Sequence, residues 1–117
     1  MASRERIIVS NNPQIKDSFP GVEFIEGNVS AVLIQVRDYV HRGYRLINHP
    51  LAASVVSEGN PYRSLILIPG TGLDYRSLEA IEAALSRSRE GKRHAENGWQ
   101  DLDREILKEA WQASEEL

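Results

Sequence analysis

The chain of 117 residues contains no cysteine, which excludes disulfide bonds, thiolate catalysis and cysteine-ligated metal sites. It has no apolar run near the ~18 residues that a membrane-spanning helix needs. Its first residues, MASRERIIVS, have no apolar stretch long enough for a signal peptide. An excess of positive charge is also missing, since the formal net charge is −3. We therefore predict a cytoplasmic protein that contacts neither membrane nor nucleic acid.

The composition is typical of one globular domain. Hydrophobic residues make up 41% and charged residues 26% of the chain, both near the average for folded proteins. A chain of this length buries roughly two thirds of the surface that its unfolded form exposes, enough for one core. We predict a single α/β domain over 1–117 that ends in a helical extension over 97–117.

Strand and helix patterns alternate along the chain. Short apolar and β-branched runs predict strands at 6–10, 22–26, 44–48 and 64–68. Helical spacing and capping residues predict helices at about 14–18, 29–42, 75–90 and 98–115. This order favours a small, mainly parallel four-stranded sheet flanked by helices. The segment 49–63 has no clear helical pattern, so an antiparallel fourth strand is the alternative.

Three of these strands should be neighbours in the core. The segments 6–10, 44–48 and 64–68 hold most of the β-branched and apolar residues outside the helices. The run Ser64–Ile68 is the most apolar of them, which is typical of a central strand.

Polar side chains follow the predicted strands where each strand ends. Asn11 and Asn12 follow the first strand, and His49 follows the third. Ligands of open α/β sheets bind beyond the carboxyl ends of the strands, so these residues predict a pocket for a small polar or anionic ligand. The more common role of such amides is to cap helices, and capping would fully explain Asn12 and Asn28.

Two further features bear on chemistry. His49 is the best candidate for an acid or base, because imidazole titrates near neutral pH. The three histidines of the chain have no matched spacing, so we expect no metal site.

Thr71 lies in a Gly-Thr-Gly turn between a strand and a helix, which makes it a candidate for binding phosphate. Tyr75 stands where a dinucleotide fingerprint needs glycine or alanine.

The last helix has a wide apolar arc. It consists of Trp99, Leu102, Ile106, Leu107, Ala110, Trp111 and Ala113. An arc wider than one docking surface needs predicts a homodimer formed through residues 98–115. The alternative is that Trp99 closes one end of the core and Trp111 packs beside the preceding helix.

Four stretches together resemble one protein family. They are IIVSNNP at 7–13, VRDYVHRGYRLINHPLAASV at 36–55, NPYRSLIL at 60–67 and LDYRSLEAIEAAL at 73–85. They resemble the GrdX family of small proteins, which are encoded beside the glycine, sarcosine and betaine reductase components of amino-acid-fermenting anaerobes. The segment before Pro61 departs from the family's usual run. The resemblance implies an accessory role with a reductase component as partner, and it assigns no catalytic residue or cofactor.

The residues that match the family and are polar form our candidate site. They are Asn11, Asn12, His49, Tyr62, Arg63 and Ser64, to which Thr71 is added from its turn. Because the chain has no thiol, we expect binding, ligand sensing or assembly rather than electron transfer. The alternative is a small enzyme in which His49 is the acid or base and Asn11 or Asn12 orients the substrate.

Overall fold

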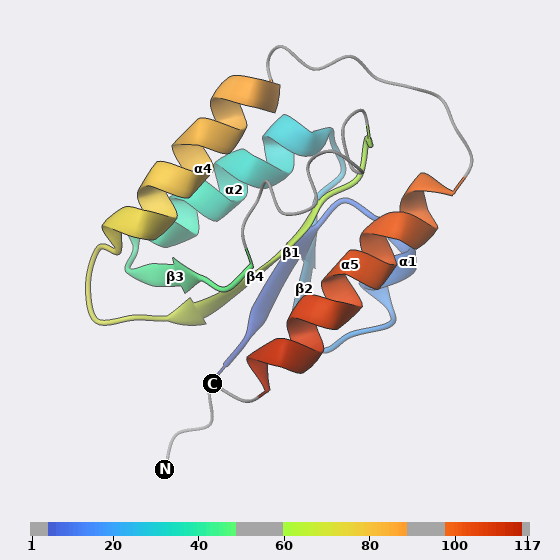
Figure 1. Cartoon of the computed structure of the whole chain (residues 1–117), viewed down its shortest axis with the longest axis horizontal. Coiled ribbons are helices and arrows are strands. Elements are labelled where there is room, and N and C mark those ends of the chain that lie inside the picture. Colours follow the sequence, from blue (N-terminus) through green and yellow to red (C-terminus); the bar gives the residue numbers. More distant parts are fainter. Residues whose placement is uncertain (1–4, 49–59, 89–97, 116–117) are drawn as a thin grey trace.

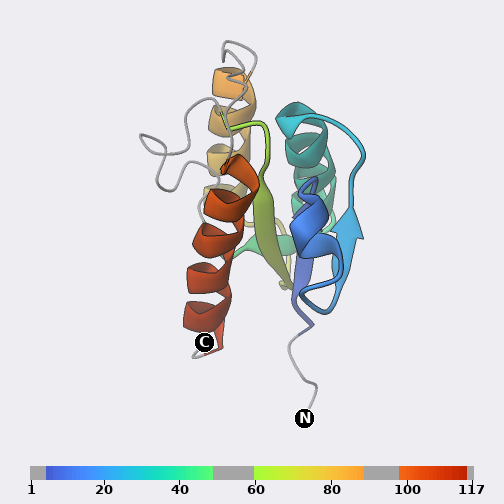
Figure 2. The same ribbon diagram turned by 90° about the vertical axis from the view of Figure 1, so that its right-hand side faces the viewer.

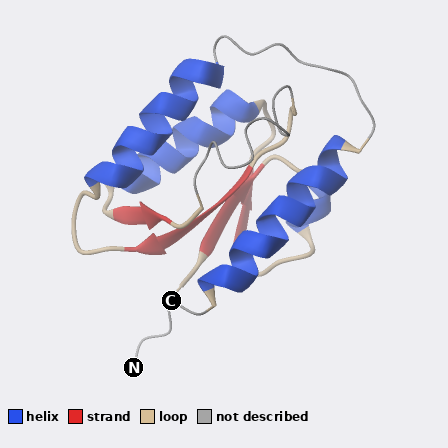
Figure 3. Ribbon diagram, viewed as in Figure 1, coloured by secondary structure: helices blue, strands red, loops and turns tan. Residues whose placement is uncertain are grey.

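The computed structural model describes residues 5–48, 60–88 and 98–115. The strands are β1 (Ile7–Ser10), β2 (Val22–Phe24), β3 (Tyr44–Leu46) and β4 (Ser64–Pro69). The helices are α1 (Pro13–Lys16), α2 (Val29–His41), α4 (Tyr75–Ser88) and α5 (Trp99–Ser114). The strands form one sheet in the order β2-β1-β4-β3 between two pairs of helices (Figures 1 and 3).

The sheet is mixed, so the prediction of a mainly parallel sheet is wrong. Only β1 and β2 pair in parallel, whereas β4 is antiparallel to both of its neighbours. The chain that leaves β3 returns as the adjacent strand in the opposite direction, and such a pair needs no crossover helix. The alternative of an antiparallel fourth strand is therefore confirmed. The predicted adjacency of the three core strands is also confirmed, with β4 between β1 and β3.

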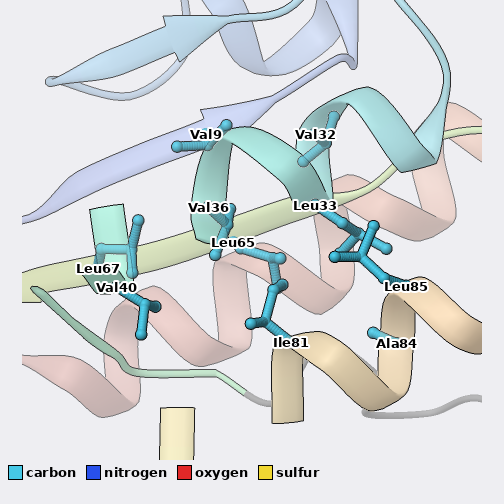
Figure 4. Packing of buried hydrophobic residues seen from close by; sticks show 10 residues of the cluster. All are labelled: Val9, Val32, Leu33, Val36, Val40, Leu65, Leu67, Ile81, Ala84 and Leu85. Atoms are coloured by element: carbon cyan, nitrogen blue, oxygen red, sulfur yellow. The ribbon is translucent and has the colours of Figure 1, made fainter. Parts of the chain in front are cut away.

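One face of the sheet is covered by α2 and α4, which pack against each other (Figure 1). The buried apolar side chains of this layer are Val9, Val32, Leu33, Val36, Val40, Leu65, Leu67, Ile81, Ala84 and Leu85 (Figure 4). The helix residues recur at the spacing of one amphipathic face, as the sequence predicted. This layer is the larger of two cores.

The second face is covered by α1 and α5. Its buried cluster is smaller and consists of Ile8, Ile15, Ile66 and Leu107. Neighbouring residues of a strand point to opposite faces, which is why Ile8 and Ile66 lie here while Val9 and Leu65 face the other layer. Figure 2 shows α5 and α2 on opposite sides of β4.

The helix ends follow the predicted capping chemistry in three places. The side chain of Asn12 accepts a hydrogen bond from the Gln14 N–H (3.0 Å), and that of Asn28 accepts one from the Ala31 N–H (2.9 Å). Gly43 follows the end of α2 with φ of 96°, a conformation that glycine adopts at little cost. The helix α5 instead begins after Gly98 with no side-chain cap.

Asp74 and Ser77 connect α4 to the edge strand β3. Ser77 donates to Asp74 through its N–H (3.1 Å) and its hydroxyl (2.5 Å), which caps the helix. The Ser77 hydroxyl also accepts a hydrogen bond from the Leu46 N–H (2.9 Å). A backbone donor of the edge strand is thus paired with a helix side chain, which removes it from pairing with another chain.

The helix α5 faces the sheet in a different phase from the one predicted. Its buried residues are Asp103, Leu107 and Ser114, whereas Ala113 is exposed. Trp111 is half-buried and does not pack beside the preceding helix, because α5 and α4 lie on different faces (Figure 1).

Trp111 is covered from within the chain. Its ring meets Phe19 edge to face at 5.6 Å, and the Arg6 guanidinium lies 3.4 Å from the ring centroid. Arg6 also donates to the Trp111 carbonyl (3.0 Å) and to the Ser114 hydroxyl (2.8 Å). Pairing of two copies through residues 98–115 remains a prediction.

None of the helices in the described ranges is long and apolar enough to cross a membrane.

The close contact between two turns leads to a stability prediction. A Cβ atom on Gly70 would lie 2.6 Å from the Gly43 carbonyl oxygen, whereas one on Gly72 would meet nothing within 4 Å. We expect Gly70→Ala to lower the free energy of unfolding by about 1–3 kcal/mol, because backbone must move. Gly72→Ala should change it by less than about 1 kcal/mol. Urea denaturation of both variants measures the difference, and equal effects would contradict the close approach.

Candidate functional site

We call the end of the sheet where β1 ends and β4 begins the rim. A buried polar network lies there, and it consists of Ser10, Asn12, Ser64 and Asp103, each at most 5% exposed. Ser10 and Ser64 face each other across the β1–β4 pair, Asn12 caps α1, and Asp103 comes from α5. We refer to these four residues as the rim network.

The hydrogen bonds of the rim network converge on one carboxylate oxygen. Asp103 Oδ2 accepts from the Ser64 hydroxyl (2.6 Å) and from Asn12 Nδ2 (3.0 Å). The Ser64 hydroxyl has one hydrogen, which it donates to Asp103. In the 2.7 Å hydrogen bond between the two serine hydroxyls, Ser10 is therefore the donor. The Ser10 oxygen in turn accepts from the Asn12 N–H (3.0 Å). The hydroxyl donors therefore lead from Ser10 through Ser64 to Asp103.

Burial dominates the electrostatics of Asp103. It raises the pKa of this carboxyl above its usual value, because the charged form loses hydration. Hydrogen bonds from Ser64 and Asn12 and the positive charge of Arg63 act in the opposite direction and only partly offset it. The carboxylate is held by directional contacts in a place that disfavours its charge.

Asn11 organises the neighbouring segment. Its Nδ2 donates to the carbonyls of Gly27 (3.0 Å) and Pro61 (2.9 Å), and its Oδ1 accepts from the Arg63 N–H (2.9 Å). One amide thus joins the end of β1, the residue before the cap of α2 and the residues that lead into β4. Its role in this structure is to hold main chain in place.

The first turn of α5 is attached through side-chain amides. Asn60 Nδ2 donates to the Trp99 carbonyl (3.1 Å), and Asn12 Nδ2 donates to the Gln100 carbonyl (2.9 Å). Gln100 Nε2 donates to the Tyr62 hydroxyl (2.9 Å). These bonds, together with Asp103, fix the start of the helix against the rim.

The structure brings together five of the seven predicted site residues. Asn11, Asn12, Tyr62, Arg63 and Ser64 all lie at the rim, in contact through the bonds described above. Asn11 and Asn12 are directed to different partners, since Asn11 binds the start of α2 and Asn12 binds α5.

The other two predicted residues do not join this group in the described structure. Thr71 lies at the opposite end of the sheet, because β4 runs antiparallel to β1 and its carboxyl end is beside the start of β3. His49 lies outside the described residues. Asn48, which precedes it, donates to the Ser64 carbonyl (3.1 Å) and accepts from the Ile66 N–H (2.7 Å). The prediction of a pocket that includes His49 therefore remains untested.

Sequence reasoning missed Asp103 and Ser10. Asp103 was overlooked because the apolar arc of the last helix suggested an inward stripe through Leu102 and Ile106. The available signal was its spacing, since Asp103 lies four residues before Leu107 and hence on the same helix face. Ser10 ends an apolar strand and is 0% exposed, and only its position opposite Ser64 reveals its role.

The chemistry available in the rim network is limited. A serine nucleophile needs a base that takes its proton and access to a substrate. The Ser64 hydroxyl donates to the Asp103 carboxylate, but Ser64 is only 4% exposed, so access to a substrate is lacking. In the described ranges no imidazole adjoins this hydroxyl, and no three His, Asp or Glu side chains gather as metal ligands. The arrangement is suited to fixing α5 and the entry of β4.

Comparison with known proteins gives one match. The family model described as GrdX-like protein matches residues 7–110, which includes all four residues of the rim network. No curated protein and no solved structure matches the chain.

The raised pKa of Asp103 leads to a prediction about stability and pH. The contribution of this carboxyl to stability is fully present below its unfolded pKa and is lost as pH rises through its higher folded pKa. Asp103→Asn keeps an oxygen that can accept from Ser64 and Asn12 and removes the buried charge. We therefore expect this variant to gain stability relative to the original chain as pH rises from 4 to about 7.

Two further variants complete this test. Asp103→Ala leaves the Ser64 and Asn12 donors unpaired and should cost about 1–3 kcal/mol at neutral pH. Glu109→Gln changes an exposed carboxyl on the same helix and should show no comparable pH-dependent gain. Denaturant unfolding at several pH values measures all three. A stability difference between Asp103→Asn and the original chain that does not change with pH would contradict the assignment.

Proposed function

Because the chain belongs to the GrdX-like family, we propose that it is a non-catalytic accessory protein of the glycine, sarcosine and betaine reductase system. It acts by binding a reductase component and a small ligand. The resemblance implies the system in which it works. The structure of the rim is the basis for the non-catalytic part of the proposal.

The observation that carries this proposal is the internal pairing of the rim. The serine hydroxyls and the carboxylate of the rim network, the groups there that could act as nucleophile, acid or base, bond to each other, and they are buried. Functional groups prepared for catalysis keep an approachable reacting atom. The polar groups of this rim instead position helices and strands, as expected of a binding protein.

The composition supports the same conclusion. The reductases of this system use thiol and selenol chemistry, and the chain has no cysteine. Electron transfer through a thiol of this protein is therefore excluded. A contribution to the reductase reaction then comes through association, assembly or the sensing of a ligand.

The proposal is tested with purified reductase components. Sedimentation velocity of the chain mixed with each component separately should reveal a complex with at least one of them. The chain alone, given glycine, sarcosine or betaine with a reductant, should form no product. The reconstituted reductase should change its rate or its extent of assembly when the chain is added.

The variant Asp103→Asn serves as the matched control. It removes the only described carboxylate bonded to the Ser64 hydroxyl while its hydrogen-bond acceptor is kept. An accessory protein should bind the same component and change the reductase to the same extent with either residue. Product formation by the chain alone that is abolished in Asp103→Asn would overturn the proposal, and so would the absence of any complex.

A further inference from the structure

Arg63 lies beside the rim network without a counter-ion in the described part of the chain. It is half-buried, and within the described ranges none of its five guanidinium N–H groups donates to another residue and no carboxylate forms an ion pair with it. An arginine removed from water is normally paired with an anion, because its charge loses hydration. Within the described residues, the Arg63 guanidinium is therefore free to bind an acceptor that these residues do not supply.

Asp103 does not supply that acceptor. Its charge acts on the Arg63 guanidinium, but its Oδ2 is already bound by Ser64 and Asn12. Burial lowers the pKa of Arg63 despite the attraction to Asp103. The two opposite charges lie in the same region without direct contact, so the cost of burying the guanidinium is not recovered there.

The main chain of Arg63 is held on both sides by one residue. Its N–H donates to Asn11 Oδ1 (2.9 Å), and its carbonyl accepts from the Asn11 N–H (3.4 Å). Asn11 is itself 6% exposed and is bonded to Gly27 and Pro61. The side chain of Arg63 therefore starts from a fixed point, which lowers the entropy cost of binding a ligand.

We propose that Arg63 binds an oxyanion, the carboxylate or phosphate group of a small ligand, at the rim. The planar fork of a guanidinium matches both groups with two parallel hydrogen bonds. The inference rests on the proposed function in one respect, since it names the chemical class of the ligand that the accessory protein binds. It does not depend on which reductase component is the partner.

The test measures binding of two simple probes to the full chain. Inorganic phosphate and acetate are titrated separately at constant ionic strength against chloride, and the Arg63 side-chain N–H and backbone signals are followed by NMR. We expect saturable binding of at least one probe. Loss of the charged, bidentate contact in Arg63→Gln should weaken that binding about tenfold or more. Binding of phosphate alone indicates a phosphate ligand, and binding of acetate alone indicates a carboxylate.

Two variants make the result specific. Arg104→Gln removes a partly exposed arginine that follows Asp103 and pairs with Asp101 and Glu105. It should leave the dissociation constant within about twofold, since such surface charges contribute little. Arg63→Lys keeps the charge and removes the fork, so its affinity should lie between those of the original chain and Arg63→Gln. Equal weakening by Arg104→Gln, or no saturable binding of either probe, would overturn the proposal.

Stability without anions gives a second readout. If Arg63 lacks a partner in the free protein, Arg63→Gln should be at least as stable as the original chain in chloride, because a buried unpaired charge is removed. A clear loss of stability would show that Arg63 has a structural partner and would also overturn the proposal.

Failure of anion binding with an intact reductase complex rejects only the ligand class. Anion binding without any complex rejects the accessory role instead.

Discussion

The attachment of α5 to the sheet depends on the buried carboxylate of Asp103. Only three residues of this helix are buried, and two of them, Asp103 and Ser114, are polar. Leu107 adds apolar contact, but such contact does not specify a position along the sheet. The two hydrogen bonds to Asp103 Oδ2 are directional and join the helix to both β4 and the α1 cap. They therefore fix where α5 lies, at the cost of burying a charge.

The two faces of the sheet have different roles in the fold. The face under α2 and α4 buries ten apolar side chains (Figure 4), and burial of apolar surface is the main source of folding free energy. The face under α1 and α5 has four buried apolar residues and polar contacts at both ends of the helix. Arg6 holds the end near Trp111, and Asp103 holds the other. We infer that the first face supplies most of the stability and the second supplies a defined docking position.

The sequence predicted the elements well because each has a local cause. Asn12 and Asn28 cap helices, Gly43 ends one, and the apolar run at 64–68 is a central strand. The direction of β4 was less accessible, since it depends on whether the link after β3 crosses the sheet, which no single residue encodes. Because β4 runs antiparallel to β1, Thr71 lies at the end of the sheet opposite the rim.

The candidate site was predicted as a set of residues but not as a set of roles. Asn11 and Asn12 are candidates because they follow a predicted strand, and Ser64 is one because it matches the family and is polar. They proved to be bonded to main chain or to Asp103. The spacing of Asp103 from Leu107 places both on one helix face, but it does not show that this face is buried, because helix phase is ambiguous when apolar residues cover a wide arc. Long-range pairing across 91 positions, as between Asn12 and Asp103, is set only by the fold.

Asp103 and Arg63 carry opposite charges at the rim but form no ion pair in the described structure. A direct ion pair would offset the desolvation of both groups, and both act on each other electrostatically. The rim network instead gives the carboxylate two neutral donors, a serine hydroxyl and an amide. This arrangement leaves the guanidinium available for the oxyanion proposed above. In that case Asp103 has a second effect, because a carboxylate close to the site limits how much negative charge a ligand of Arg63 can bring to the rim.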